Sequence, residues 1–242
     1  MAGHNKWSKI KNKKGKEDAR RAKEFTKLGR ALMVAAKQGG DNPDYNATLK
    51  SAIEKAKSIN MPNDNIMRAI KKGVSSSEGD NFEQVTYEGY GPGGIAVIVE
   101  TLTDNRNRTA PDVRHAFDKF GGNLGTSGSV SFMFDHVGVI VLDQSKYDYD
   151  EFMLDALEAD VKDIKTEDGM IIVYTEIEDF SSVKSYLTEK TYEFVDSDIM
   201  YVAQNYQTLQ GQDNLDMEKL IDMLEENDDV QNVYHNWIED EE

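Results

Sequence analysis

The order of apolar segments in residues 137–204 constrains the fold of this chain more than any other feature of its sequence. Short runs rich in β-branched residues predict strands, and runs with apolar residues at helical spacing predict helices. In order, the segments are VGVIVLD (137–143), DEFMLDALEAD (150–160), VKDIKTED (161–168), MIIVYTE (170–176), SSVKSYLTEK (181–190) and YEFVDSDIMYVAQ (192–204). They predict the order βαββαβ, with Asp168-Gly169 as the turn of the central hairpin.

This order is the ferredoxin-like pattern, and strand signals flank it on both sides. Before it, FEQVTYEGY (82–90) and IAVIVETLT (95–103) predict a hairpin around GPGG. After it come a predicted helix with Leu215, Leu220, Met223 and Leu224, and a predicted strand, VQNVYHNW (230–237). One helix and one strand are too little for a domain. We therefore expect them to complete the sheet begun at residue 82, which makes the ferredoxin-like segment an insertion.

Residues 25–73 predict a small helical bundle. Apolar residues recur at helical spacing from Phe25 to the Gly39-Gly40 stop, again after Pro43, and a third time from residue 63 to Gly73. VSSSEGDN (74–81) is a polar linker. The predicted fold class is therefore α+β with three domains: a helical domain (1–78), a split α/β domain (79–134 with 207–242) and the inserted ferredoxin-like domain (135–206).

Charge is divided unevenly along the chain. Residues 1–72 hold 18 Lys and Arg against 7 Asp and Glu, a net charge of +11. The remaining residues hold 10 against 38, a net charge of −28. A basic segment on an acidic chain indicates a polyanionic partner for that segment, either nucleic acid or the ribosome. The alternative is a solvated basic face that only balances the acidic domains.

Composition excludes several classes of protein. Hydrophobic residues make up 38% and charged residues 30%, which favours a folded chain over a disordered one. The chain has no cysteine, which excludes disulfides and thiolate metal sites and fits a cytoplasmic location. No apolar run reaches the ~18 residues of a membrane span. The basic N-terminus has no apolar signal-peptide core, although a mitochondrial presequence stays an open alternative.

No pattern of catalytic or cofactor-binding residues is present. The histidines, His4, His115, His136 and His235, lack the spacing of metal ligands. No serine sits in a nucleophile elbow. We therefore expect no enzymatic activity, no metal, no cofactor and no small-molecule substrate.

The strongest candidate site is the basic N-terminal arm and the helix that follows it. GHNKWSKIKNKKGK (3–16) carries six lysines around one tryptophan, with no acidic residue. Basic side chains of this density bind nucleic-acid phosphates. The candidate nucleic-acid-binding residues are Lys6, Trp7, Lys9, Lys11, Lys13, Lys14, Lys16, Arg20, Arg21, Lys23, Lys27 and Arg30.

A second possible contact lies in residues 103–130. It consists of Arg106, Arg108, Arg114, His115 and Lys119, which surround a predicted helix N-terminus in an otherwise acidic region. Thr109 and Asp112 have capping-box spacing, so we expect Arg106 and Arg108 to lie in a loop before the helix. Ion pairs with nearby acids such as Glu88 and Glu100 are an equally acceptable role for these arginines. After the loop, SVSFMF (129–134) alternates like a strand, with Val130, Phe132 and Phe134 on one face.

Two glycine-rich stretches resemble phosphate-binding loops. Gly89, Gly91 and Gly94 satisfy the G-x-G-x-x-G spacing, but a predicted strand follows them where a dinucleotide site needs a helix, so a hairpin turn is favoured. GGNLGTSG (121–128) offers backbone amides that could face phosphate, or it could end a helix as a glycine-rich cap.

Several long motifs occur in the order typical of one family. MAGHNKW at the start, FTKL (25–28), AIEKAKSINMPNDNIMRAIKKG (52–73), YEGYGPGG (87–94) and the run from DNRNRT to GSV (104–130) resemble the YebC/PmpR family. The sequence motifs match closely over the first 130 residues. Beyond them, the order of predicted elements agrees with the family more than the motifs do. The family usually has serine where this chain has Asn5, a small polar change that affects only the detailed contacts of the arm.

The resemblance implies a three-domain protein with a helical domain and two α/β domains, one inserted in the other. It also implies a cytoplasmic, DNA-binding transcriptional regulator. Some members of the family, including a mitochondrial relative, are tied instead to translation at stalled ribosomes. A third hypothesis is a protein-interaction module that uses the acidic face. Because no recognition helix is evident, most of the binding energy is expected to come from phosphate contacts.

Overall fold

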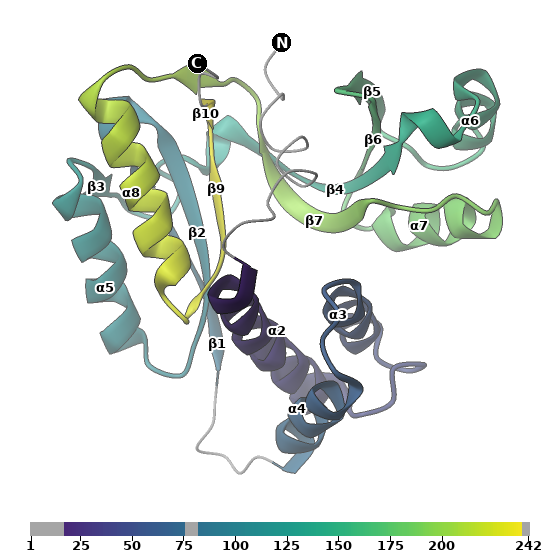
Figure 1. The fold of residues 1–242 in the computed structure, drawn as a ribbon, viewed down its shortest axis with the longest axis horizontal. Helices are drawn as coiled ribbons and strands as arrows, with labels where there is room; N and C mark the ends of the chain where they lie inside the picture. Colours follow the sequence, from purple (N-terminus) through teal and green to yellow (C-terminus); the bar gives the residue numbers. More distant parts are fainter. Residues whose placement is uncertain (1–16, 76–81, 239–242) are drawn as a thin grey trace. The chain divides into compact units, whose positions relative to one another are not determined.

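The computed structural model describes residues 17–75 and 82–238, with side chains from residue 22 onward. The described chain divides into two compact units (Figure 1). The first, which we call the helix–sheet unit, comprises residues 17–75, 82–130 and 210–235. The second, which we call the inserted unit, comprises residues 131–209 and 236–238.

Three described helices begin the helix–sheet unit: α2 (Glu17–Gly39), α3 (Ala47–Ser58) and α4 (Asn63–Ser75) (Figure 1). The predicted apolar stripes form their common core, which includes Leu32, Leu49 and Ile70. The buried side chain of Asn46 caps α3 by accepting from the amide of Leu49 at 3.0 Å, and its Nδ2 donates to carbonyls at the end of α2. The helical bundle expected from the sequence is thus present.

Helices α2 and α4 approach so closely at Gly73 that the position has no room for a side chain. A Cβ there would collide with the carbonyl oxygen of Met33. Glycine to alanine in a helix normally stabilises by up to about 1 kcal/mol. At Gly73 we expect the opposite, because backbone has to move: Gly73→Ala lowers the free energy of unfolding by about 1–3 kcal/mol.

The matched control is Gly29→Ala in α2, where a Cβ meets nothing within 4 Å. This variant should be unchanged or more stable by up to about 1 kcal/mol. Urea titration of both variants checks the pair. Equal stability of the two variants would contradict the close packing of α4 on α2.

A four-stranded antiparallel sheet and two further helices complete the helix–sheet unit. Its strands are β1 (Glu83–Tyr90), β2 (Ala96–Thr103), β3 (Asn123–Leu124) and β9 (Val230–His235), in the order β3-β1-β2-β9. Strand β9 pairs with β2, so the C-terminal segment returns to this sheet as expected. Helices α5 (Arg106–Lys119) and α8 (Gln212–Glu226) lie side by side (Figure 1), with Phe117 of α5 against Gly89, and Met217 and Leu220 of α8 against Gly91.

Two sequence predictions in this region are wrong. Helix α5 begins at Arg106 and not near Thr109, because the side chain of Asn105 is the N-cap and accepts from the amide of Arg108 at 3.2 Å. Pro111 consequently lies inside the helix. Residues 129–133 are not part of a strand: Ser131–Met133 form a 3₁₀ helix, and Phe132 is 69% exposed. Of the predicted strand, only Phe134 lies in one, as its first residue.

The inserted unit has the predicted βαββαβ order (Figure 1). It consists of β4 (Phe134–Asp143), α6 (Tyr149–Ala156), β5 (Asp163–Glu167), β6 (Met170–Thr175), α7 (Phe180–Glu189) and β7 (Asp196–Ala203). The strand order β5-β6-β4-β7 with antiparallel neighbours is that of a ferredoxin-like sheet. Asp168 and Gly169 both have positive φ, which confirms the hairpin turn.

The end of the chain differs from the prediction of one continuous strand. Strand β9 stops at His235, and Trp237–Ile238 form β10, which pairs in parallel with β8 (Gln207–Thr208) in the inserted unit. Asn236, between the two strands, is fully buried.

Candidate nucleic-acid interface

The arm that carries most of the predicted interface falls outside the described residues. This applies to Lys6, Trp7, Lys9, Lys11, Lys13, Lys14 and Lys16. Arg20 and Arg21 belong to the first turns of α2, but their side chains are not described.

The next three predicted residues, Lys23, Lys27 and Arg30, contact the end of α8 and the turn that follows it. The Nζ of Lys27 donates to the carbonyl of Glu225 at 3.0 Å, and the Nζ of Lys23 lies 3.8 Å from the Glu226 carboxylate. The last carbonyls of a helix lack partners and carry the negative end of its dipole, so they favour cations. Burial lowers the pKa of the Lys27 amine, and the Glu225 carboxylate opposes this shift.

The central group of this contact is the carboxylate of Asp229, which is only 3% exposed. Its Oδ1 accepts from Nη1 of Arg30 at 2.7 Å, and its Oδ2 accepts from Nη2 of Arg108 at 2.8 Å. The hydroxyls of Thr109 and Thr103 also donate to Oδ2, at 2.7 and 3.3 Å. We call these five residues the Asp229 cluster. It joins α2, β2, α5 and the start of β9.

The electrostatics of the Asp229 cluster favour an ionised carboxylate. Burial alone would raise the pKa of Asp229, but hydrogen bonds from Arg108, Thr109 and Arg30 outweigh it and hold the pKa below its ordinary value. Arg30 also donates to the carbonyl of Asp228 at 2.7 Å. A buried carboxylate with two guanidinium partners and two hydroxyl donors is fully satisfied, and removing it would leave two arginines without their main partner.

Within the predicted second contact, Arg108 has structural ion-pair partners, whereas Arg114, His115 and Lys119 are exposed. Arg106 and Arg108 lie in the first turn of α5 and not in a loop, because Asn105 starts the helix earlier than expected. Arg108 does pair with acids, but with Asp104 and Asp229 and not with Glu88 or Glu100. A functional defect in an Arg108 variant would therefore include the loss of a structural contact.

The other residues of the predicted second contact also lie on α5. Burial raises the pKa of Tyr87, and the neighbouring guanidinium of Arg106 opposes that rise. Arg114, His115 and Lys119 are exposed on α5, where the Nζ of Lys119 lies 5.2 Å from the ring centroid of Phe120. These three exposed side chains stay available to a ligand.

The backbone amides of the glycine-rich loop after α5 bind a carboxylate of the protein itself, that of Glu88. The buried carboxylate of Glu88 accepts from the amides of Gly128 and Val130 at 2.8 and 2.9 Å. Gly121 has positive φ, and the amide of Gly122 donates to the carbonyl of Phe117, so the helix-capping interpretation of Gly121-Gly122 is confirmed. The bond to Glu88 holds the Val130 amide directly before the 3₁₀ helix Ser131–Met133.

The G-x-G-x-x-G spacing belongs to a hairpin, as expected. The amide of Gly91 donates to the carbonyl of Ile95 at 2.7 Å, and Gly93 and Gly94 have positive φ in the turn between β1 and β2. No helix N-terminus follows these glycines, so they lack the geometry of a dinucleotide site.

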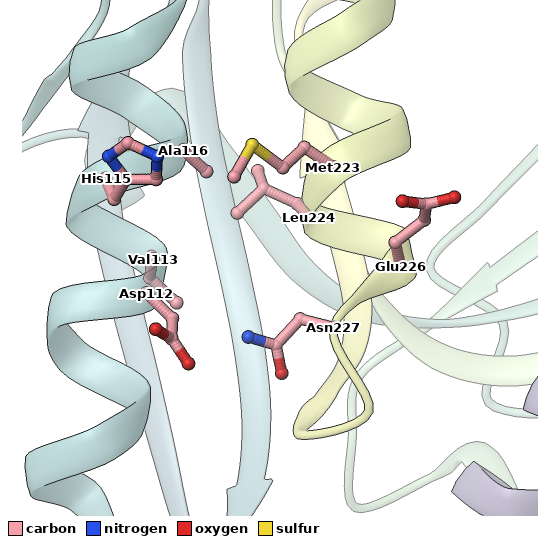
Figure 2. A pocket seen from close by; sticks show the side chains of 8 residues that line it. All are labelled: Asp112, Val113, His115, Ala116, Met223, Leu224, Glu226 and Asn227. Atoms are coloured by element: carbon pink, nitrogen blue, oxygen red, sulfur yellow. The ribbon is translucent and has the colours of Figure 1, made fainter.

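A surface pocket of about 260 Å³ lies between α5 and α8 (Figure 2). Figure 2 shows the side chains of Asp112 and His115 from α5 facing Met223 and Asn227 across the pocket. With Asp112 and Glu226 in its lining, the pocket is unsuited to phosphate. In the described part of the chain, no group of three or more His, Asp or Glu side chains is arranged to hold a metal ion. No helix in the same residues is long and apolar enough to cross a membrane.

Comparison with known proteins places the chain in a family. The model of the TACO1/YebC protein N-terminal domain matches residues 5–76, and that of the TACO1/YebC second and third domain matches residues 82–237. The chain belongs to the TACO1/YebC family. The resemblance seen in the sequence motifs is thereby confirmed.

Relatives within the TACO1/YebC family match over nearly the whole chain. A probable transcriptional regulatory protein of Finegoldia magna is 58% identical and covers 98% of this chain and 99% of its own length. One from Acetivibrio thermocellus is 54% identical with the same coverage. A crystal structure of a conserved hypothetical protein from Aquifex aeolicus matches with a TM-score of 0.84 at 43% identity, covering 98% of each chain. The names of the two relatives support a regulatory role at the level of the family.

Proposed function

We propose that this protein is a non-enzymatic regulator of gene expression that binds DNA in the cytoplasm, chiefly through phosphate contacts of its basic N-terminal arm. The observation that carries the proposal is the division of charge, with +11 in residues 1–72 and −28 in the rest. Phosphates attract the first segment and the second repels them, so contact is limited to one end of the chain. The regulator names of the relatives agree with this role.

We assign different roles to the two halves of the predicted basic site. The lysines of the arm, with Arg20 and Arg21, are the phosphate contacts. Lys23, Lys27 and Arg30 have partners at the end of α8 and in the turn after it. These contacts hold α2 against the end of α8 and the turn after it.

Fractionation of a cell lysate tests the proposal against translation at the ribosome. We expect the protein to sediment with the nucleoid and to be released by DNase but not by RNase. Sedimentation with ribosomes after DNase treatment would contradict DNA as the target and favour the translation-factor alternative. Presence only in the supernatant at low salt would contradict both and favour a protein-interaction module.

A further inference from the structure

Helix α4 carries a row of cations on its outer face that the structure leaves without ion pairs. Arg68, Lys71 and Lys72 are all exposed, and within the described part of the chain they form no ion pair or side-chain hydrogen bond. In contrast, Lys23, Lys27, Arg30 and Arg108 all have protein partners. The one acidic residue of α4, Asp64, stands one turn before Arg68.

The same face of α4 exposes two large apolar side chains. Met67 is 64% exposed and Val74 is 53% exposed. With Lys71 between them, they follow a spacing of four and three residues, which places all three side chains in one row along the helix. The opposite face, with Ile66, Ile70 and Gly73, is buried against the other helices. Helix α4 therefore presents an apolar row beside a cationic row.

The helix dipole explains only part of this pattern. Lys71 and Lys72 suit the C-terminal end of α4, where a cation contributes about 0.3–1 kcal/mol. Arg68 lies in the middle of the helix, and the dipole gives no reason for exposed Met67 and Val74. A ligand with both anionic and apolar surface accounts for all five side chains.

We infer that the outer face of α4, comprising Met67, Arg68, Lys71, Lys72 and Val74, is a second nucleic-acid contact. The three cations bind phosphates, while Met67 and Val74 pack against sugars or base edges. This inference rests on the proposed function. Charge decides the kind of partner: residues 47–75 hold six Lys and Arg against Glu54 and Asp64, and they lie in the same basic segment as the arm. None of these five residues was predicted from the sequence, where the candidate residues of the helical domain ended at Arg30.

The test is fluorescence anisotropy of the full chain with a short labelled duplex DNA over a range of salt. For Arg68→Ala/Lys71→Ala/Lys72→Ala, we expect affinity to fall about tenfold or more at ~0.1 M salt. The slope of log K against log salt should become shallower by about 2–3. The control Lys146→Ala/Lys162→Ala/Lys219→Ala removes the same charge from exposed ion pairs elsewhere and should bind within about twofold of wild type.

An uncharged variant tests the apolar row separately. Met67→Ser/Val74→Ser should bind DNA about threefold more weakly, because it removes apolar contact. Its salt slope should be unchanged, because the number of counterions released on binding stays the same. Melting temperatures check that the variants fold. If the triple variant melts early, the single Arg68→Ala variant should still make the slope shallower by about 1.

The outcomes separate this inference from the proposed function. Wild type that binds duplex DNA, together with α4 variants that bind equally well, would overturn the inference and leave the arm as the contact. An equal loss in the control triple variant would also overturn it, since total charge would then be the cause. A polyglutamate peptide that binds as tightly as DNA would overturn the phosphate assignment. Absence of any binding by wild type would overturn the proposed function itself.

Discussion

Asp229→Ala should lower the free energy of unfolding of the helix–sheet unit by about 2–3 kcal/mol. The carboxylate is buried and accepts from Arg30, Arg108 and Thr109 at 2.7–2.8 Å. Its removal leaves two guanidinium groups and a buried hydroxyl without their main acceptor. Urea titration measures the change directly, and the melting transition should fall by about 10 °C.

The matched control is Asp228→Ala. Asp228 accepts from Arg30 through its backbone carbonyl, which the substitution keeps, so we expect a change within about 0.5 kcal/mol. Equal effects of Asp228→Ala and Asp229→Ala would show that the Asp229 cluster does not join α2 to the sheet. A double-mutant cycle with Arg30→Ala should give a favourable coupling between Arg30 and Asp229.

Acid should remove the contribution of Asp229 to the free energy of unfolding. Because its folded-state pKa is below the ordinary value, the stabilisation is fully present above the unfolded pKa of about 4. It is lost as the pH falls through the folded pKa. The stability difference between wild type and Asp229→Asn should therefore be constant near neutral pH and shrink below about pH 4. A difference that grows in acid would contradict an ionised Asp229.

Changing Lys11, Lys13, Lys14 and Lys16 together to alanine should weaken duplex DNA binding about 100-fold or more at ~0.1 M salt. Each lysine that neutralises a phosphate releases a counterion, so the log–log salt slope should also become shallower by about 3. Fluorescence anisotropy over a salt series gives both quantities.

The control for the arm replaces the same four lysines by arginine, which keeps the charge. This variant should bind within about threefold of wild type, since phosphate contacts of this kind depend on charge more than on shape. Unchanged affinity and slope in the alanine variant would show that the arm only balances the acidic domains. Loss of affinity in both variants would indicate recognition of lysine geometry.

The elements that periodicity defines were predictable from the sequence. Alternating or continuous apolar runs gave the six elements of the inserted unit in order, and Asp168-Gly169 located its hairpin. The return of β9 to β2 followed from a helix and a strand that could not fold alone. Errors arose where two local signals competed. Asn105 and Thr109 are both acceptable N-caps, and only the fold shows that the hydroxyl of Thr109 serves Asp229 instead.

The Asp229 cluster was not predictable, because its members are far apart in sequence. Arg30 and Asp229 are separated by 199 positions, and Arg108 and Asp229 by 121. In the sequence, an arginine bound to a buried carboxylate looks the same as an arginine that faces solvent. The contacts of Glu88 were unpredictable for the same reason, because its partners are the amides of Gly128 and Val130, 40 and 42 positions away.

The salt dependence of duplex DNA binding by the wild-type chain tests the central claim most directly. Six lysines from Lys6 to Lys16, with Arg20 and Arg21, can neutralise roughly four to six phosphates. The arm alone therefore predicts a log–log slope of about −4 to −5, and the three cations of α4 should make the wild-type slope steeper by a further ~2–3. Binding that is absent at ~0.1 M salt, or that has a slope near zero, would contradict the account of this protein as a phosphate-binding regulator.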